Sequence, residues 1–388
     1  MKPKDIIEED KKYIAGTYAR FPVAFKEGKG SRLYDYDGRE YVDCGSGIAV
    51  NIFGVNDEEW KNAVIAQINS IQHASNLYYT KPQADLARLL CERTGAKKIF
   101  FGNSGAEANE CAIKAARKYG EIKYGADRKQ IITLKESFHG RTLATLAATG
   151  QDAFHKYYGP FPEGFVYADP TIEGVEACMN ERTCAVMIEC IQGESGVNVL
   201  DKNFVQAVEK LCRERDIIFI CDEVQTGNGR TGRLYAYQAY GVSPDIVTTA
   251  KGLGGGLPIG ACMLFEKCAG VFGYGDHGST FGGNPVVCAG AYNILSRIDE
   301  KLLQSVREKG EYFREGLKKI DGVKEVTGMG LMIGIHTDKP AAEVANECMK
   351  RGLLVLTAHS NVRLLPPLTI SKDDIDFALK ILNEVISQ

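Results

Sequence analysis

The sequence predicts an α/β fold built on a mostly parallel sheet that is covered by helices. Between about residues 55 and 275, short apolar runs typical of strands alternate with segments of helical periodicity. Acids, glycines and a lysine follow these apolar runs, and in such sheets ligands gather at the carboxyl ends of the strands. The expected strands are residues 99–101, 131–134, 185–188, 217–221 and 246–248.

The segments before and after this region follow a different pattern. Residues 32–42 alternate around Asp37-Gly38, which predicts a hairpin. The expected helices are residues 107–119, 203–214, 286–320 and 372–387. We therefore expect three parts, which are an N-terminal arm (1–50), a large domain (51–280) and a smaller C-terminal α/β domain (281–388).

The composition is that of an ordinary globular protein, with 44% hydrophobic and 25% charged residues among 388. The net charge of −3 argues against nucleic acid as a partner. No apolar stretch approaches the roughly 18–20 residues of a membrane span, and residues 1–12 are charged, so we expect neither a membrane partner nor a signal peptide. Twelve scattered cysteines and six dispersed histidines favour reduced thiols over disulfides or a metal site, and hence a cytoplasmic protein.

Lys251 is the most informative residue of the chain. It follows the apolar segment 242–250 and precedes a run rich in glycine. Asp222 stands in the same way after the apolar run 217–221. This arrangement suits a pyridoxal phosphate site, in which the lysine forms a Schiff base and the carboxylate pairs with the pyridine nitrogen. A helix cap or a turn acid is the alternative for Asp222.

Two glycine-containing segments are candidate phosphate sites. Residues 99–107 predict a strand, a glycine turn and a helix start, where Ser104 and Glu107 fit a capping box. The first amides of that helix would face an anion, although an ordinary capped helix explains the same pattern. Residues 278–285 combine hydroxyls with glycines, which suit a phosphate oxygen, a close interface or a domain hinge.

Two further loops follow predicted strands. In the first, Phe138 suits stacking on a ring and Arg141 offers a bidentate fork for a carboxylate. A core phenylalanine and a structural His139 are the alternatives there. In the second, Glu189 and Glu194 flank a glycine turn, and both a paired acid and base and a solvated loop remain open.

In their order and spacing, these segments together resemble the class III (ω-amine) pyridoxal-phosphate aminotransferases of fold type I over nearly the whole chain. The resemblance implies a mostly parallel seven-stranded-type sheet, a smaller C-terminal α/β domain and a homodimer with shared active sites. The segments that carry it are residues 18–23, 103–110, 138–142, 192–194, 221–227, 251–252, 279–285 and 362–368.

The resemblance also implies roles around the ring of pyridoxal 5'-phosphate. Lys251 would hold the cofactor and later carry a proton. Asp222 would pair with the pyridine nitrogen, and Gln225 would lie near the ring hydroxyl. Phe138 and Val224 would lie against the two faces of the ring.

The phosphate, by the same resemblance, would be held by the amides of Gly105 and Ala106. Thr280 of the partner subunit would join them. Ser279, the residue before Thr280 in this chain, is expected among the substrate-binding residues. The active site would therefore be shared between two subunits.

Three more residues would bind the small-molecule substrates, an amino acid and 2-oxoglutarate. Arg141 would take the α-carboxylate of the amine donor, and Arg363 that of 2-oxoglutarate. Glu194 would cover Arg363 while the donor is bound, so that a buried arginine is never left unpaired.

The reaction that the resemblance implies moves the terminal amino group of N2-acetylornithine to 2-oxoglutarate, in arginine biosynthesis. Residues 46–48 lack the aromatic side chain with which ornithine-specific members read a free α-amino group, which favours an acylated donor. Succinyl-diaminopimelate, succinylornithine, ornithine and 4-aminobutyrate remain alternative donors. An aminomutase would not need Glu194 and Arg363, and a non-enzymatic module would not need Lys251. Asn228 departs from the family pattern, since an apolar residue is expected there.

Overall fold

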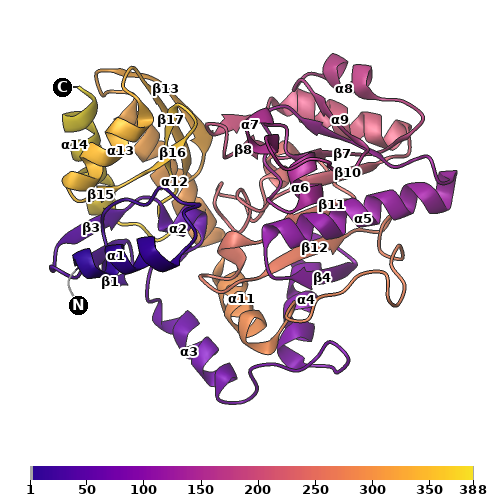
Figure 1. Ribbon diagram of the computed structural model, residues 1–388, viewed down its shortest axis with the longest axis horizontal. Helices are drawn as coiled ribbons and strands as arrows, with labels where there is room; N and C mark the ends of the chain where they lie inside the picture. The colour runs from indigo at the N-terminus through magenta and orange to yellow at the C-terminus, as the bar shows by residue number, and fades with distance from the viewer. Residues whose placement is uncertain (1–2, 388) are drawn as a thin grey trace.

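The computed structural model describes residues 3–387, and its centre is a seven-stranded sheet in the order β4-β12-β11-β10-β7-β5-β6 (Figure 1). All neighbours in this sheet are parallel except the two pairs that include β12. The expected mostly parallel sheet is therefore confirmed. Its strands are β4 (Lys98–Gly102), β5 (Gln130–Leu134), β6 (Phe165–Ala168), β7 (Thr183–Ile188), β10 (Ile218–Asp222), β11 (Ile246–Thr249) and β12 (Gly260–Leu264).

Helices cover both faces of this sheet, which explains why its central strands β7, β10 and β11 are buried throughout. Ile218 and Ile220 of β10 pack in one hydrophobic cluster with α5 (Gly105–Tyr124). Phe219 and Cys221 pack in another cluster with α9 (Lys202–Glu214). Because alternate residues of a strand point to opposite faces, α5 and α9 lie on opposite sides of the sheet.

Two strands and one helix break were not foreseen from the sequence. Strands β6 and β12 complete the sheet beyond the five predicted strands. The helical pattern predicted over residues 286–320 forms two helices, α11 (Pro285–Arg297) and α12 (Glu300–Leu317). The side chain of Asp299 accepts a hydrogen bond from the amide of Leu302 and so caps the second helix, which ends the first one.

The predicted hairpin around Asp37-Gly38 is confirmed, because β2 (Arg32–Asp35) pairs antiparallel with β3 (Glu40–Asp43). The N-terminal strands join β15, so they lie beside the C-terminal helices (Figure 1). A separate antiparallel sheet has the order β13-β14-β17-β16. The strands outside the large sheet, besides β2 and β3, are β1 (Phe25–Lys29), β8 (Ile191–Gln192), β9 (Asn198–Val199), β13 (Val323–Met329), β14 (Met332–Thr337), β15 (Leu353–Leu354), β16 (Leu356–Ala358) and β17 (Asn361–Leu364).

The remaining helices complete the layers around the two larger sheets. Helix α11 packs against α3 and α4, below the large sheet in Figure 1. Among residues 3–387, no helix is both long and apolar enough to cross a bilayer. The helices not yet described are α1 (Pro3–Tyr13), α2 (Ser46–Ala49), α3 (Glu58–Ile68), α4 (Lys81–Thr94), α6 (Leu143–Ala148), α7 (Asp152–His155), α8 (Ile172–Cys178), α10 (Tyr237–Tyr240), α13 (Ala341–Lys350), α14 (Lys372–Ile386) and the 3₁₀ helix η1 (Lys251–Leu253).

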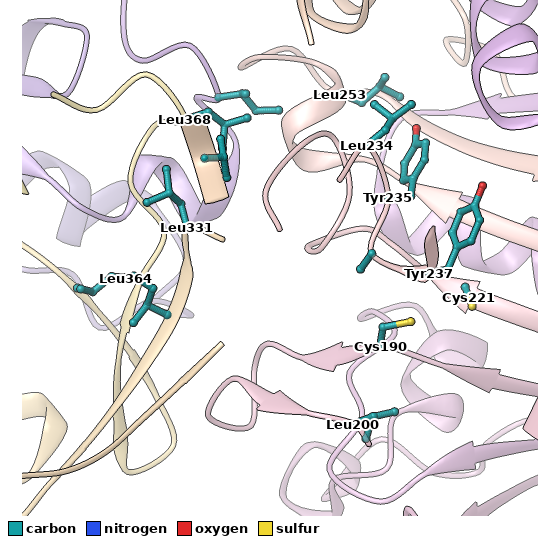
Figure 2. Packing of buried hydrophobic residues seen from close by; sticks show 14 of the residues in the cluster. Cys190, Leu200, Cys221, Leu234, Tyr235, Tyr237, Leu253, Leu331, Leu364 and Leu368 are labelled. Atoms are coloured by element: carbon teal, nitrogen blue, oxygen red, sulfur yellow. The ribbon is translucent and has the colours of Figure 1, made fainter. Parts of the chain in front are cut away.

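One hydrophobic cluster joins the large sheet to the C-terminal segment. Figure 2 shows part of it, including Cys221 at the end of β10, and Leu331 and Leu368 from the C-terminal segment. Buried Arg230 adds polar links across the same junction, because its Nη1 donates to the carbonyl of Leu331 (3.1 Å) and to that of Pro366. The two parts therefore share a core, and the loops between them are held in place.

Candidate active site

A cavity of about 460 Å³ lies where the predicted site residues meet. Its wall is formed by the residues that follow β4, β5, β10 and β11, together with Glu189 after β7. This is the carboxyl edge of the parallel strands, where ligands of such sheets bind. Eight of the twelve predicted site residues line the cavity, namely Gly105, Ala106, Phe138, Arg141, Asp222, Val224, Gln225 and Lys251.

Asp222 is the last residue of β10, and its carboxylate is 4% exposed. Its Oδ2 accepts hydrogen bonds from Nδ2 of Asn109 (2.7 Å) and from Nδ1 of His139 (2.8 Å). Its Oδ1 accepts one from the amide of Val224 (3.0 Å). These three donors fix the carboxylate in one orientation at the cavity wall, ready to accept one more hydrogen bond from a ligand.

Lys251 begins the turn that follows β11, and its side chain lines the same cavity. Its backbone has φ of +40°, which is uncommon for a residue other than glycine. Its Nζ lies 3.9 Å from Oε1 of Glu194. Burial lowers the pKa of Lys251, although the charge of Glu194 works against that effect. A lysine with a lowered pKa is a better nucleophile and proton acceptor than an exposed one.

Glu194 and Arg363 form an ion pair next to Lys251. Nη1 of Arg363 lies 2.8 Å from Oε1 of Glu194, and Nη2 lies 3.3 Å from Oε2. Gln225 bridges the pair, because its Nε2 donates to Glu194 (2.9 Å) and its Oε1 accepts from Arg363 (3.1 Å). Burial alone would raise the pKa of Glu194, but the charges of Arg363 and Lys251 outweigh it and lower the value to about 2.

The pair lies beside the cavity rather than on its wall. Gln225 and Lys251 line the cavity, whereas Glu194 and Arg363 contact it through them. Arg363 is 3% exposed, and its Nε has no hydrogen-bond partner within residues 3–387. Glu194 pairs with both Nη atoms, so the unpartnered Nε can still donate to one further acceptor. A substrate carboxylate that took the place of Glu194 would keep the buried guanidinium paired.

The start of α5 forms the opposite end of the cavity. Ser104 caps the helix, since its Oγ accepts from the amide of Glu107 (3.2 Å). The full capping box that the sequence predicts is absent, because the carboxylate of Glu107 accepts from the amide of Asn103 (2.5 Å) rather than from that of Ser104. As first residues of the helix, Gly105 and Ala106 have amides without intrahelical acceptors. These amides line the cavity and suit a phosphate.

Phe138 and Arg141 form the outer wall. Phe138 is half-buried, and its amide donates to Oε2 of Glu189 (2.9 Å). Burial, and next the charge of Asp222, raise the pKa of Glu189 well above its ordinary value. Arg141 is exposed at the cavity rim, and its guanidinium lies 5.3 Å from the ring centre of Phe138. An exposed arginine at a cavity rim can meet a carboxylate that enters from solvent.

Ser279 and Thr280 lie outside this cavity. Oγ of Ser279 accepts from Nδ2 of Asn103 (3.1 Å) and from the amide of Gly282 (2.9 Å), so it stabilises its own loop. Thr280 is exposed. The structure therefore brings eight predicted residues together directly, connects Glu194 and Arg363 to them, and leaves these two hydroxyls facing elsewhere.

Three further residues belong to the site: Asn109 was not predicted, His139 was considered structural, and Glu189 was left open between a paired acid and base and a solvated loop. Asn109 and His139 orient Asp222, and Glu189 orients the backbone of Phe138. A signal for Asn109 was available, because it is a polar residue on the apolar face of a predicted helix. Oδ1 of Asn109 and Nε2 of His139 are buried and have no partner within the described residues.

An unusual turn packs against η1, the 3₁₀ helix that begins at Lys251. Ser46, Gly47, Ile48 and Ala49 have φ values of +49°, +62°, +63° and +62°, which are four consecutive left-handed residues. The turn packs against η1, where a Cβ at Gly252 would collide with the side chain of Ile52. Residues 46–48, where the sequence lacks an aromatic side chain, therefore belong to a strained segment that packs next to the turn of Lys251.

The donor set of the cavity fits pyridoxal phosphate. Free helix amides stand at one end, a fixed carboxylate at the wall, and a lysine with a lowered pKa between loops. The unpartnered Asn109 Oδ1 gives a further polar atom at the wall. A phosphate, a protonated pyridine nitrogen and an aldehyde carbon each find a complementary group there.

The comparisons with known proteins agree with this chemistry. The family model described as Aminotransferase class-III matches residues 13–386. An acetylornithine aminotransferase of Haemophilus ducreyi is 48% identical and covers 100% of both chains, and that of Caldanaerobacter subterraneus is 47% identical over 99% of each. The solved ornithine aminotransferase of Toxoplasma gondii, with PLP at partial occupancy in its active site, has a TM-score of 0.95 at 30% identity and covers 100% of this chain and 94% of that chain.

Proposed function

The chain belongs to the class III aminotransferases, and from this premise we propose that it moves the terminal amino group of N2-acetylornithine to 2-oxoglutarate. The products are N-acetylglutamate 5-semialdehyde and glutamate, in arginine biosynthesis. The observation that carries the proposal is the buried Arg363–Glu194 pair beside Lys251. The two substrates carry their carboxylates at different distances from the reacting carbon. The arginine that binds the carboxylate of one substrate, Arg363, must therefore be neutralised by Glu194 while the other substrate is bound.

The choice of donor has three supports. Relatives 42–48% identical over nearly the whole chain are acetylornithine aminotransferases. Residues 46–48 carry no aromatic side chain that could read a free α-amino group. Arg141 stands exposed at the rim, where the carboxylate of a long donor ends. An acylated ω-amine donor satisfies all three.

Pyridoxal phosphate is the cofactor of this family, and when bound it supplies an electron sink next to the amine-bearing carbon of the substrate. Lys251 would hold it covalently, and Asp222 would keep a proton on its ring nitrogen. The amides of Gly105 and Ala106 would bind its phosphate. Phe138 and Val224 would lie against the ring, and Gln225 would lie near the ring hydroxyl.

Lys251 would also carry the proton that leaves the amine-bearing carbon of the substrate and is returned to the cofactor. Its lowered pKa leaves a larger neutral fraction near pH 7, so that its Nζ can accept a proton from the substrate. Glu194, 3.9 Å away, stabilises the ammonium form that results. When the carboxylate of 2-oxoglutarate takes Arg363, Glu194 moves off the guanidinium.

We place the functional unit in a homodimer, with Thr280 serving the phosphate of the neighbouring site. A patch of exposed apolar side chains lies next to Thr280, formed by Leu77, Tyr78, Tyr79 and Phe281. Nδ2 of Asn76 joins the two segments by donating to the carbonyls of Ser279 and Gly282, at 2.9 Å each. Contiguous exposed apolar groups of this kind favour a subunit interface. The twelve free cysteines favour a reducing compartment, which we take to be the cytoplasm.

A donor panel tests the proposal. Purified protein is assayed with 2-oxoglutarate and each of five amines, which are N2-acetylornithine, ornithine, succinylornithine, succinyl-diaminopimelate and 4-aminobutyrate. We expect kcat/KM for N2-acetylornithine to exceed that for ornithine by at least about 100-fold, since a site without partners for a free ammonium group rejects it. Equal use of ornithine would overturn the donor assignment. Product formation without 2-oxoglutarate would favour the aminomutase.

A further inference from the structure

Asn228 stands where the family pattern leads us to expect an apolar side chain. It lies in the loop after β10, and it is 1% exposed. Its φ is +56°, a left-handed conformation that asparagine tolerates better than most residues with a Cβ. A buried amide in an uncommon backbone conformation calls for a physical reason.

The amide of Asn228 contacts the residues that directly precede Lys251. Its Nδ2 donates to Oγ1 of Thr249 (2.9 Å), which ends β11, and to the carbonyl of Ala250 (3.2 Å). The carbonyl of Ala250 also accepts from the amide of Leu253 (2.8 Å), which closes the turn of η1. Both lone pairs of this carbonyl are therefore used, so the Ala250–Lys251 peptide has one preferred orientation.

That peptide decides where the side chain of Lys251 begins. Lys251 has φ of +40°, and the next residue, Gly252, packs so tightly on Ile52 that a Cβ would collide there. The turn is thus fixed by packing after Lys251 and by Asn228 before it. Without the amide of Asn228, the carbonyl of Ala250 keeps one partner, and the peptide can rotate.

We propose that Asn228 is a positioning residue, whose side-chain amide orients the Ala250–Lys251 peptide and so aims the Lys251 amine at its reaction partner. The inference rests on the proposed role of Lys251 as the residue that holds the cofactor and carries the proton. An apolar side chain at position 228 fills the same space but donates no hydrogen bond. Asn228 therefore makes the orientation of Lys251 depend on a hydrogen bond that an apolar side chain could not donate.

Two variants separate the hydrogen bond from the backbone conformation. Asn228→Met keeps bulk and removes the donor. Asn228→Gly removes the donor as well, but glycine adopts positive φ without strain, so this variant remains informative if the first one folds poorly. Gln130→Met is the matched control, because Nε2 of Gln130 likewise donates to one backbone carbonyl, that of Cys178 (2.9 Å), and to one threonine hydroxyl, that of Thr183 (3.0 Å). Gln130 is the first residue of β5, so it lies at the amino end of the strand, whereas the cavity lies at the carboxyl ends.

Each holoenzyme is measured in three ways, which are the rate constant of each half-reaction at saturation, the apparent Kd of each substrate, and the pH midpoint of the absorbance change of the bound cofactor. Both Asn228 variants should lose about 10- to 100-fold in both rate constants, the loss expected for a misplacement of up to 1 Å. The Kd values should stay within about 3-fold, and the pH midpoint should move by at least about 0.5 unit, because it reports the surroundings of the Lys251 nitrogen. Gln130→Met should lower the melting temperature alone.

Unchanged rates and an unchanged pH midpoint in Asn228→Gly would overturn the positioning role, as would equal effects of Gln130→Met. A wild-type protein that binds no cofactor at Lys251, shown by borohydride reduction and peptide mapping, would instead overturn the proposed function on which the inference rests. The two failures are therefore distinguishable in the same set of samples.

Discussion

Replacement of Glu194 by glutamine should convert a donor-selective site into one that accepts glutamate readily. In the folded protein the pKa of Glu194 falls from its ordinary value of 4.5 to about 2. At about 1.4 kcal/mol per pKa unit, its surroundings stabilise the carboxylate by about 3 kcal/mol. A substrate carboxylate that binds Arg363 must displace this interaction, so its affinity is lower than it would be at a free arginine.

Glutamine keeps the size of the side chain but removes its charge. Glutamate and 2-oxoglutarate should therefore bind about 10- to 100-fold more tightly, a range that stays below the full 3 kcal/mol because Lys251 and Gln225 share in it. N2-acetylornithine, whose carboxylate lies far from Arg363, should change by less than about 3-fold. Each Kd is obtained from the absorbance change of one half-reaction, followed separately with each substrate. The matched control is Glu311→Gln. It removes the partner of another arginine, Arg314, whose Nη2 lies 2.6 Å from Oε2 of Glu311, and this pair does not line the cavity.

The same pair also contributes to stability, with a defined pH dependence. Because the folded pKa of Glu194 is depressed, its contribution is fully present above the unfolded value of 4.5 and is lost as pH falls toward 2. Glu194→Gln should lower the melting temperature at pH 7, where Arg363 loses its partner, and the difference from wild type should shrink below pH 4.5. If glutamate affinity and donor preference stay unchanged, the reasoning on the covered arginine is wrong.

Three further outcomes are expected. Asp222→Asn should keep the fold and lose at least about 10³-fold in kcat because the ring nitrogen loses its charged partner, and near-normal turnover would contradict this role. Arg363→Lys should slow the half-reaction with 2-oxoglutarate more than that with N2-acetylornithine, and Arg141→Lys should do the reverse, because lysine cannot replace a bidentate fork; stopped-flow absorbance measures both, and equal slowing would argue against separate duties. Thr280→Ala mixed with inactive Lys251→Ala should regain activity through hybrid dimers, and a mixture that stays inactive after verified subunit exchange would exclude a shared site.

The parts of the fold that local pattern determines were predicted well. The strands before Asp222 and Lys251 are short runs that are buried on both faces, and the polar residues that follow them are visible in the sequence. Strand β12 is an apolar run of the same kind, but it follows a glycine-rich turn directly, without an intervening α-helix, so the alternation of strands and helices did not indicate it. The break between α11 and α12 depends on the cap at Asp299, which a pattern of apolar spacing does not register.

The candidate site shows the same division. Lys251 and Asp222 are predicted from their residue type after strand-like runs, whereas Arg363 is expected only from the family resemblance. Asn109 and Glu189 act on other residues through hydrogen bonds between segments far apart in the chain. The sequence shows that both residues are polar groups at unusual positions, but their partners are fixed only by folding and cannot be derived from sequence spacing. The half-formed capping box at Ser104 has the same cause, since Asn103 competes for Glu107.

The left-handed turn at residues 46–49 has an evolutionary consequence. A left-handed conformation costs about 1–2 kcal/mol for each residue that carries a Cβ, and three of these four residues do. Selection for stability alone would replace Ser46, Ile48 and Ala49 by glycine, yet glycines would loosen a turn that packs against η1, which begins at Lys251. Selection for stability and selection for catalysis thus favour different residues at these positions. Other parts of the protein must supply the stability that this segment costs.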